Sequence, residues 1–111
     1  MKNILILGGT GFVGAHVCEK LARADCSVTL VTRRLSNADH VKHLPRLTLQ
    51  ELNAYDEAAL TRALAGHDAV VNLVAILHGT QAEFEKTHVA LPKILSHACL
   101  AAGVAQVVHV S

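Results

Sequence analysis

The strongest constraint on the fold is a short apolar run near the N-terminus that leads into three spaced glycines. Residues 4–7 (Ile-Leu-Ile-Leu) show no polar alternation, which is typical of a strand buried on both faces of a parallel sheet. Gly9, Gly11 and Gly14 follow with the spacing G-x-G-x-x-G. In such a turn the first glycine permits the sharp bend, the second lets the backbone approach phosphate, and the third lets helix and strand pack closely. The stretch therefore predicts a strand, a phosphate-binding turn and a helix.

Glycine-rich turns also form for conformational reasons alone. The G-x-G-x-x-G spacing therefore indicates a phosphate-binding turn only where the flanking segments form a strand and a helix. Val13, Val17 and Leu21 fall at i, i+4 and i+8 on one face of the predicted helix. A second apolar strand at residues 27–31 completes a strand–helix–strand unit of about 30 residues, the expected length for this motif. This context favours a dinucleotide site over a purely structural turn.

The residues after the second strand indicate which dinucleotide the turn would hold. NAD-specific sites carry an acidic residue about 20 residues beyond the glycines, which accepts hydrogen bonds from the adenosine ribose 2′-OH. This chain carries Arg33 and Arg34 in that region, and a guanidinium can pair with a 2′-phosphate. The sequence therefore predicts NADP(H) in preference to NAD(H), with NAD(H) still possible. The alternative is that one or both arginines cap a solvent-facing loop.

The remaining segments alternate between predicted helices and strands, which indicates an α/β fold. Asp56 is the expected N-cap of the middle helix, and Gly66 is its expected stop. Pro92 predicts either a kink in the last helix or its true start, and Gly103 is expected to end that helix. The predicted architecture is a Rossmann-type, doubly wound parallel sheet in the order 3-2-1-4-5 with helices on both faces. The later strands are expected at residues 47–52, 68–77 and 105–111, and the later helices at 36–44, 57–65 and within 82–102.

That strand order brings two further pairs of residues to the ligand-binding edge of the sheet. Asn53 and Ala54 follow the third strand, where the adenine is expected to lie, although a plain turn explains them almost as well. Val74 and Ala75 end the fourth strand, which is expected to pass beneath the pyrophosphate and the nicotinamide ribose. A small residue such as Ala75 leaves room there.

Composition limits the other functions this chain could have. Its 111 residues suffice for one domain, and its formal net charge of +1 gives no broad electrostatic reason to expect nucleic acid. No apolar run approaches the roughly 20 residues of a spanning helix, and the chain start is too short for a secretory signal, so a cytoplasmic location is expected. Cys18, Cys26 and Cys99 are odd in number, which suits reduced thiols. His40 and His43 lack further ligands at a persuasive spacing, so no metal site is predicted.

Several segments together resemble the N-terminal part of an extended or atypical short-chain dehydrogenase/reductase, of the epimerase/dehydratase type. They are residues 8–14, 72–75, 87–89 and 103–111, and the resemblance covers the whole chain. It is closest to the NAD(P)-binding family that includes the nucleotide-binding accessory subunit of respiratory complex I. Asn53 departs from this family, which usually has an acidic residue there, and His88 stands where the family often has Asn. Together with the glycine spacing, the resemblance implies cofactor contacts by Gly8, Gly9, Thr10, Gly11, Phe12, Val13, Gly14, Arg33, Arg34, Asn53, Ala54, Val74 and Ala75.

The Tyr-x-x-x-Lys pair that such reductases and epimerases use for proton exchange is absent from this chain. Its only tyrosine is Tyr55, and Ala59 stands four residues on. No catalytic residue is therefore predicted, and residues 1–111 are interpreted as the N-terminal portion of an NAD(P)-binding domain from a longer protein. The leading hypothesis is the cofactor-binding segment of an oxidoreductase or epimerase.

Two other functions stay open at this point. One is a non-catalytic dinucleotide module with a structural or sensing role, in a larger assembly such as a respiratory complex and peripheral to its inner membrane. The other is an interaction protein that has lost its ligand. The fifth strand is expected to be an exposed apolar edge, which predicts self-association of the chain.

Overall fold

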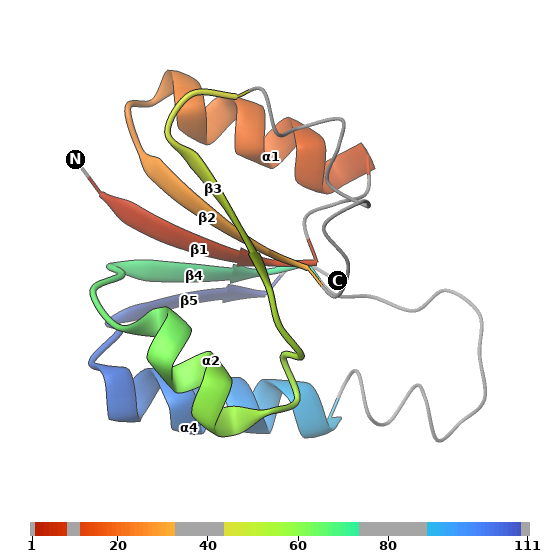
Figure 1. The fold of residues 1–111 in the computed structure, drawn as a ribbon, viewed down its shortest axis with the longest axis vertical. Coiled ribbons are helices and arrows are strands. Elements are labelled where there is room, and N and C mark those ends of the chain that lie inside the picture. The colour runs from red at the N-terminus through yellow and green to blue at the C-terminus, as the bar shows by residue number, and fades with distance from the viewer. Residues whose placement is uncertain (1, 9–11, 33–43, 74–88, 110–111) are drawn as a thin grey trace.

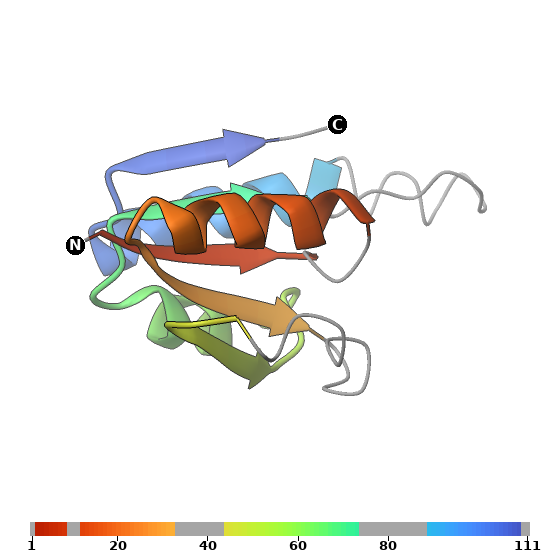
Figure 2. The ribbon, with the colours of Figure 1, turned by 90° about the horizontal axis from the view of Figure 1, so that it is seen from above.

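A five-stranded parallel sheet in the order β3-β2-β1-β4-β5 forms the centre of the molecule (Figure 1). The computed structural model describes residues 2–8, 12–32, 44–73 and 89–109. Helix α1 covers one face of the sheet, and α2 and α4 cover the other (Figures 1 and 2). The predicted α/β class and strand order are confirmed. The elements are β1 (Asn3–Leu7), α1 (Phe12–Arg23), β2 (Ser27–Thr32), β3 (Leu47–Glu51), α2 (Glu57–Leu64), β4 (Ala69–Asn72), α4 (Leu91–Ala102) and β5 (Gln106–His109).

Strand β1 is the buried centre of this sheet. It pairs in parallel with β2 on one side and β4 on the other, with Leu7 opposite Val31 and Asn72. Leu5 and Ile6 are fully buried, although adjacent residues of a strand point to opposite faces. Both faces are therefore covered by helices at this strand, which explains why its sequence shows no polar alternation.

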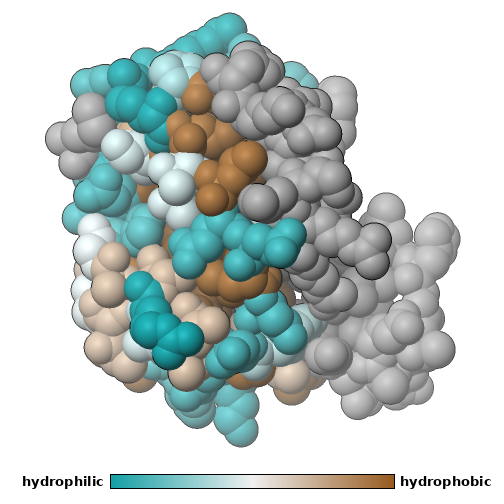
Figure 3. Space-filling model, in the orientation of Figure 1, coloured by the Kyte–Doolittle hydropathy of each residue, from teal (hydrophilic) through white to brown (hydrophobic). Residues whose placement is uncertain are grey.

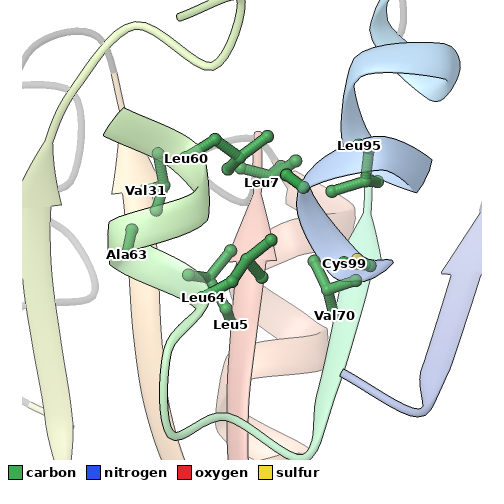
Figure 4. Packing of buried hydrophobic residues seen from close by; sticks show 10 residues of the cluster. Leu5, Leu7, Val31, Leu60, Ala63, Leu64, Val70, Leu95 and Cys99 are labelled. Atoms are coloured by element: carbon green, nitrogen blue, oxygen red, sulfur yellow. The ribbon is translucent and has the colours of Figure 1, made fainter. Parts of the chain in front are cut away.

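The face under α2 and α4 holds the larger of the two apolar clusters (Figure 4). Strands β1, β2 and β4 contribute from the sheet, and the two helices pack on them with leucines and small residues. Leu91, Leu95 and Cys99 are spaced four residues apart on one face of α4, and all three are buried. The cluster comprises Leu5, Leu7, Val31, Leu60, Ala63, Leu64, Val70, Leu95, Ala98 and Cys99.

Helix α2 begins and ends close to its predicted limits. Oδ1 of Asp56 accepts a hydrogen bond from the backbone N–H of Ala59 at 3.2 Å, so the predicted N-cap is confirmed. The helix ends at Leu64, one residue earlier than predicted, because Ala65 has a ψ of 129° and leaves the helical conformation. Gly66 then takes a φ of +82°, which favours glycine.

The regular part of helix α4 starts at Leu91, which places Pro92 in its first turn, one of the two predicted alternatives. Val89 and Ala90 before it are already helical, with a π-type turn. Gly103 ends the helix with a φ of 78°, and its N–H donates to the carbonyl of Cys99, as predicted. Residues 82–88 of the predicted helix lie outside the described residues.

On the described part of α1, the residue that faces the sheet most directly is not one of those predicted. Val17 and Leu21 pack against the sheet as expected but stay half-buried, whereas Cys18 beside them is fully buried. The helix therefore turns Cys18 and Ala22 toward the sheet. The side chain of Val13 and nearly all of the predicted 36–44 helix lie outside the described residues, and Leu44 is not helical.

The two edges of the described sheet are unequally covered. Leu47 and Leu49 of β3 are half-buried against the second apolar cluster, which lies under α1, and apolar surface is visible near this edge in the space-filling view (Figure 3). This cluster comprises Ile4, Ile6, Cys18, Val28, Leu30 and Ala69. At the other edge, Val107 and Val108 of β5 are 38% and 40% exposed. Strand β3 ends at Glu51, β4 is described to Asn72 and β5 to His109, so the outer parts of the predicted strands 68–77 and 105–111 lie beyond the described elements.

Candidate functional site

The carboxyl ends of the parallel strands meet at one edge of the sheet, and the candidate site lies there. Chain order reverses at β1, since β2 and β3 lie on one side of it and β4 and β5 on the other. Open α/β sheets bind ligands outside the carboxyl ends of their strands at such a reversal. The site is therefore built on the ends of β1 and β4, with the ends of β2 and β3 beside them.

Gly8 forms the first part of the predicted turn. It follows β1 directly, is exposed, and has a φ of +74°, a conformation that L side chains adopt only with strain. Helix α1 starts four residues later at Phe12, and residues 12–15 contain no acidic side chain that would repel an anion. The first N–H groups of a helix have no partner within it and favour an anion. Gly9, Thr10 and Gly11 lie outside the described residues, as do the side chains of residues 12–15, Phe12 and Val13 included; Gly14 is placed within α1.

The end of β2 is tied to the end of β3 by the backbone. The N–H of Leu52 donates to the carbonyl of Thr32 at 3.1 Å, and the strand register sets Glu51 opposite Thr32. Arg33 and Arg34, the predicted 2′-phosphate ligands, lie outside the described residues. Glu51, which is exposed, lies at the end of β3 opposite Thr32, the last residue of β2.

Sequence reasoning missed Glu51 as a residue of this edge. Its position depends on how β3 aligns with β2, 19 residues apart at the Thr32–Glu51 pair, and the local sequence does not fix that register.

Asn53 and Ala54 follow β3 but differ in what they can contact. Asn53 is exposed, and its Oδ1 accepts a hydrogen bond from the N–H of Tyr55 at 3.0 Å. Its backbone carbonyl accepts one from the N–H of Asp56, also at 3.0 Å. Ala54 is half-buried against the α2/α4 cluster. Of the two predicted base contacts, Asn53 is therefore the more accessible.

The end of β4 continues the pairing with β1 beyond the strand itself. The N–H of Leu73 donates to the carbonyl of Leu7 at 2.9 Å, and Asn72 is only 5% exposed. Asn72 and Thr32 are the buried polar side chains of the described residues, and both lie at carboxyl ends of strands that flank β1. Val74 and Ala75 lie outside the described residues, so their predicted contacts stay predictions.

No group with activated nucleophilic or metal-binding character accompanies this edge in the described part of the chain. Burial raises the pKa of the Cys18 and Cys99 thiols, which keeps both neutral. Residues 2–8, 12–32, 44–73 and 89–109 contain no group of three or more potential metal ligands. Within those same ranges, no helix has the length and apolar character needed to span a bilayer.

Comparison with known protein families gives a match over nearly the whole chain. Residues 4–111 match the model of the NAD dependent epimerase/dehydratase family. The match includes the β1–turn–α1 segment and every strand of the sheet.

Individual proteins of known sequence or structure are similar over most of this chain. Mouse (Mus musculus) NADH dehydrogenase [ubiquinone] 1 alpha subcomplex subunit 9, mitochondrial, is 30% identical over 96% of the chain. The dTDP-glucose 4,6-dehydratase of Neisseria meningitidis is 29% identical over 80% of it. The crystal structure of UDP-N-acetylglucosamine 4-epimerase from Bacillus cereus is 26% identical, with a TM-score of 0.79 over 98% of this chain and 39% of that one. The chain spans only 29% of the length of each of the first two relatives.

Proposed function

This chain belongs to the NAD dependent epimerase/dehydratase family, and we propose that it is the NAD(P)(H)-binding segment of an oxidoreductase or nucleotide-sugar epimerase-like protein. The observation that carries the proposal is Gly8 at a φ of +74°, set between the buried strand β1 and helix α1 at the point where strand order reverses. The names of the Neisseria and Bacillus relatives support a nucleotide sugar as the substrate class of the longer protein. This chain carries no Tyr-x-x-x-Lys pair, so we expect it to bind the cofactor without turnover when alone.

We further propose that NADP(H) is preferred over NAD(H). Arg33 and Arg34 follow β2 and supply two guanidinium groups at the position where NAD-specific sites carry a carboxylate. A hydrogen bond to a charged group contributes about 1.5–3 kcal/mol, and about 1.4 kcal/mol is tenfold in affinity, so the preference amounts to one or two decades.

Calorimetric titration with NADPH and NADH in parallel tests both parts of the proposal. Arg33→Ala and Arg34→Ala are expected to weaken NADPH binding about tenfold or more while changing NADH binding little. Arg62→Ala is the matched control, since it removes the same charge from an exposed position on α2. Equal binding of both dinucleotides by the original chain would keep the site and reject the arginine argument. Binding of neither would contradict the dinucleotide site in this chain.

A second candidate function is a dinucleotide module that does not catalyse a reaction. It is favoured by the similarity to the mouse NADH dehydrogenase subunit, whose name places it in a larger complex. Incubating the full-length protein with NAD(P)+ and nucleotide sugars distinguishes the two functions. Reduction of the nicotinamide or epimerisation of the sugar would reject the non-catalytic function.

We also propose that the isolated chain self-associates through β5. This strand pairs with β4 on one side, and no strand covers its other side among the described residues. It carries no charged Lys or Glu that would oppose edge pairing, and Val107 and Val108 are substantially exposed. Val108→Lys is expected to lower the sedimentation coefficient to that of a monomer. Leu100→Lys, which changes an 82% exposed residue of α4, is the control. A monomeric original chain at high concentration would contradict the proposal.

We propose a cytoplasmic location because the three cysteines form no disulfide with one another. All three cysteines are free, and two of them are buried in separate clusters on opposite faces of the sheet. Unpaired thiols are typical of a reducing compartment. Fractionation of cells that produce the protein would test the location, and recovery from an oxidising compartment would contradict it.

A further inference from the structure

The C-terminal end of α1 is held by an arginine from outside the helix. Arg46 lies directly before β3, and its Nη2 donates to the backbone carbonyl of Ala22 at 2.7 Å. The same nitrogen lies 3.2 Å from Oδ1 of Asp25. The last carbonyls of a helix have no partner within it and favour a cation, so a guanidinium is stabilised at this position. Two residues 24 positions apart in sequence are thus joined at this end of α1.

Arg46 and Asp25 both adopt backbone conformations that are unusual for residues with a side chain. Their φ values are +57° and +65°, and they are the positive-φ residues other than glycine in the described part of the chain. Such a conformation costs an L residue free energy, and it persists where the surrounding structure requires it. The backbone of Arg46 is also held, because its carbonyl accepts a hydrogen bond from the N–H of Val28 at 3.0 Å. Arg46 therefore ties α1 to β2 and to the start of β3.

The contacts of α1 with the sheet oppose a shift of the helix along its axis only weakly. Among the described residues, α1 is the one helix on its face of the sheet, and its C-terminal end lies over the amino ends of the strands (Figure 2). Its deepest contacts come from the small side chains of Cys18 and Ala22, whereas the larger Val17 and Leu21 stay half-buried. Small side chains make few van der Waals contacts with the strands below them. A tie at the end of the helix therefore has an effect that the packing alone does not supply.

We propose that Arg46 is a positioning residue for the dinucleotide site, an inference that rests on the proposed function. A helix of 12 residues is rigid and about 18 Å long, so a displacement at its C-terminal end is transmitted to its N-terminus. By holding the carbonyl of Ala22, Arg46 fixes where the first N–H groups of α1 lie relative to the turn at Gly8. The ion pair with Asp25 contributes little by itself, since the two side chains are 36% and 74% exposed.

Two substitutions of Arg46 separate positioning from stability. Arg46→Ala removes the guanidinium but keeps the strained φ, whereas Arg46→Gly removes both the guanidinium and the strain. Arg46→Gly is therefore expected to unfold at a higher temperature than Arg46→Ala. By calorimetric titration, both variants are expected to bind NADPH and NADH roughly threefold to tenfold more weakly than the original chain, the equivalent of up to one misaligned hydrogen bond to phosphate. The pyrophosphate is common to both dinucleotides, so the ratio of their affinities is expected to stay the same.

Arg23→Ala is the matched control. It removes the same charge from the last residue of α1, where Arg23 pairs with Glu19 of the same helix at 2.6 Å and so does not tie α1 to another element. Its affinities are expected to equal those of the original chain when every variant is measured well below its Tm. Affinities that recover in Arg46→Gly in step with its stability, or that Arg46→Ala leaves unchanged, would overturn the positioning role while leaving the dinucleotide site intact. Failure of the original chain to bind either dinucleotide would instead reject the proposed function, and with it this inference.

Discussion

Replacement of Gly8 by alanine tests whether the turn after β1 serves the ligand as well as the fold. Gly8 has a φ of +74°. An L residue in this left-handed conformation costs about 1–2 kcal/mol relative to glycine, so Gly8→Ala is expected to lower the free energy of unfolding by that amount. In a domain of about 100 residues this corresponds to a fall in Tm of roughly 4–9 °C, which differential scanning calorimetry measures readily.

Two other glycines of the chain provide the control for backbone strain. Gly66 and Gly103 have φ values of +82° and +78°, and a Cβ added at either would meet no atom within 4 Å. Gly66→Ala and Gly103→Ala therefore report the cost of the conformation alone. Since neither glycine lies at the carboxyl edge of the sheet, neither variant is expected to change dinucleotide affinity when measured well below its Tm.

The ligand-binding role predicts a different outcome for Gly8 than for these two controls. Its added Cβ would lie at the turn where backbone is expected to approach the pyrophosphate, so Gly8→Ala is expected to weaken NADPH binding at least tenfold at a temperature where the chain is folded. Similar affinities for all three variants would refute the placement of Gly8 in the site. A negligible loss of stability in Gly66→Ala and Gly103→Ala would refute the strain argument itself.

Three further predictions concern the cap of helix α2 and the buried thiols. Asp56→Ala removes the acceptor of the Ala59 N–H and is expected to cost about 1 kcal/mol of unfolding free energy, measured by urea denaturation, whereas Asp56→Asn should retain most of it. A thiol reagent at pH 8 is expected to modify only the half-buried Cys26 in the native chain and all three cysteines after unfolding, because Cys18 and Cys99 are buried and their raised pKa keeps them protonated. Rapid reaction of all three thiols in the native chain would contradict the burial. Since folding raises these two pKa values, their contribution to stability is complete below the ordinary value of 9.0 and is lost as the pH rises through the folded values, which a urea titration series from pH 7 to 11 would detect.

The local sequence was sufficient to predict those strand and helix limits that depend on neighbouring residues. The run before Gly8 predicted a strand covered on both faces, and Asp56, Gly66 and Gly103 predicted helix limits that the structure matches to within one residue. Pro92 illustrates the limit of such reasoning. A proline is compatible with either a kink or a start, and the surrounding helix determines which of the two occurs.

The chain itself thus determined its alternation of strands and helices, the glycine-rich segment after β1, and the two arginines after β2. These properties follow from backbone conformation and from the chemistry of residues close together in sequence. Only the tertiary structure decided that Glu51 lies opposite Thr32, that Cys18 is buried more deeply than Val17 and Leu21, and that both oxygens of Asn53 accept hydrogen bonds. Strand register and helix rotation are set by packing between segments distant in sequence, because a shift of one residue would turn every apolar side chain of a strand to the opposite face.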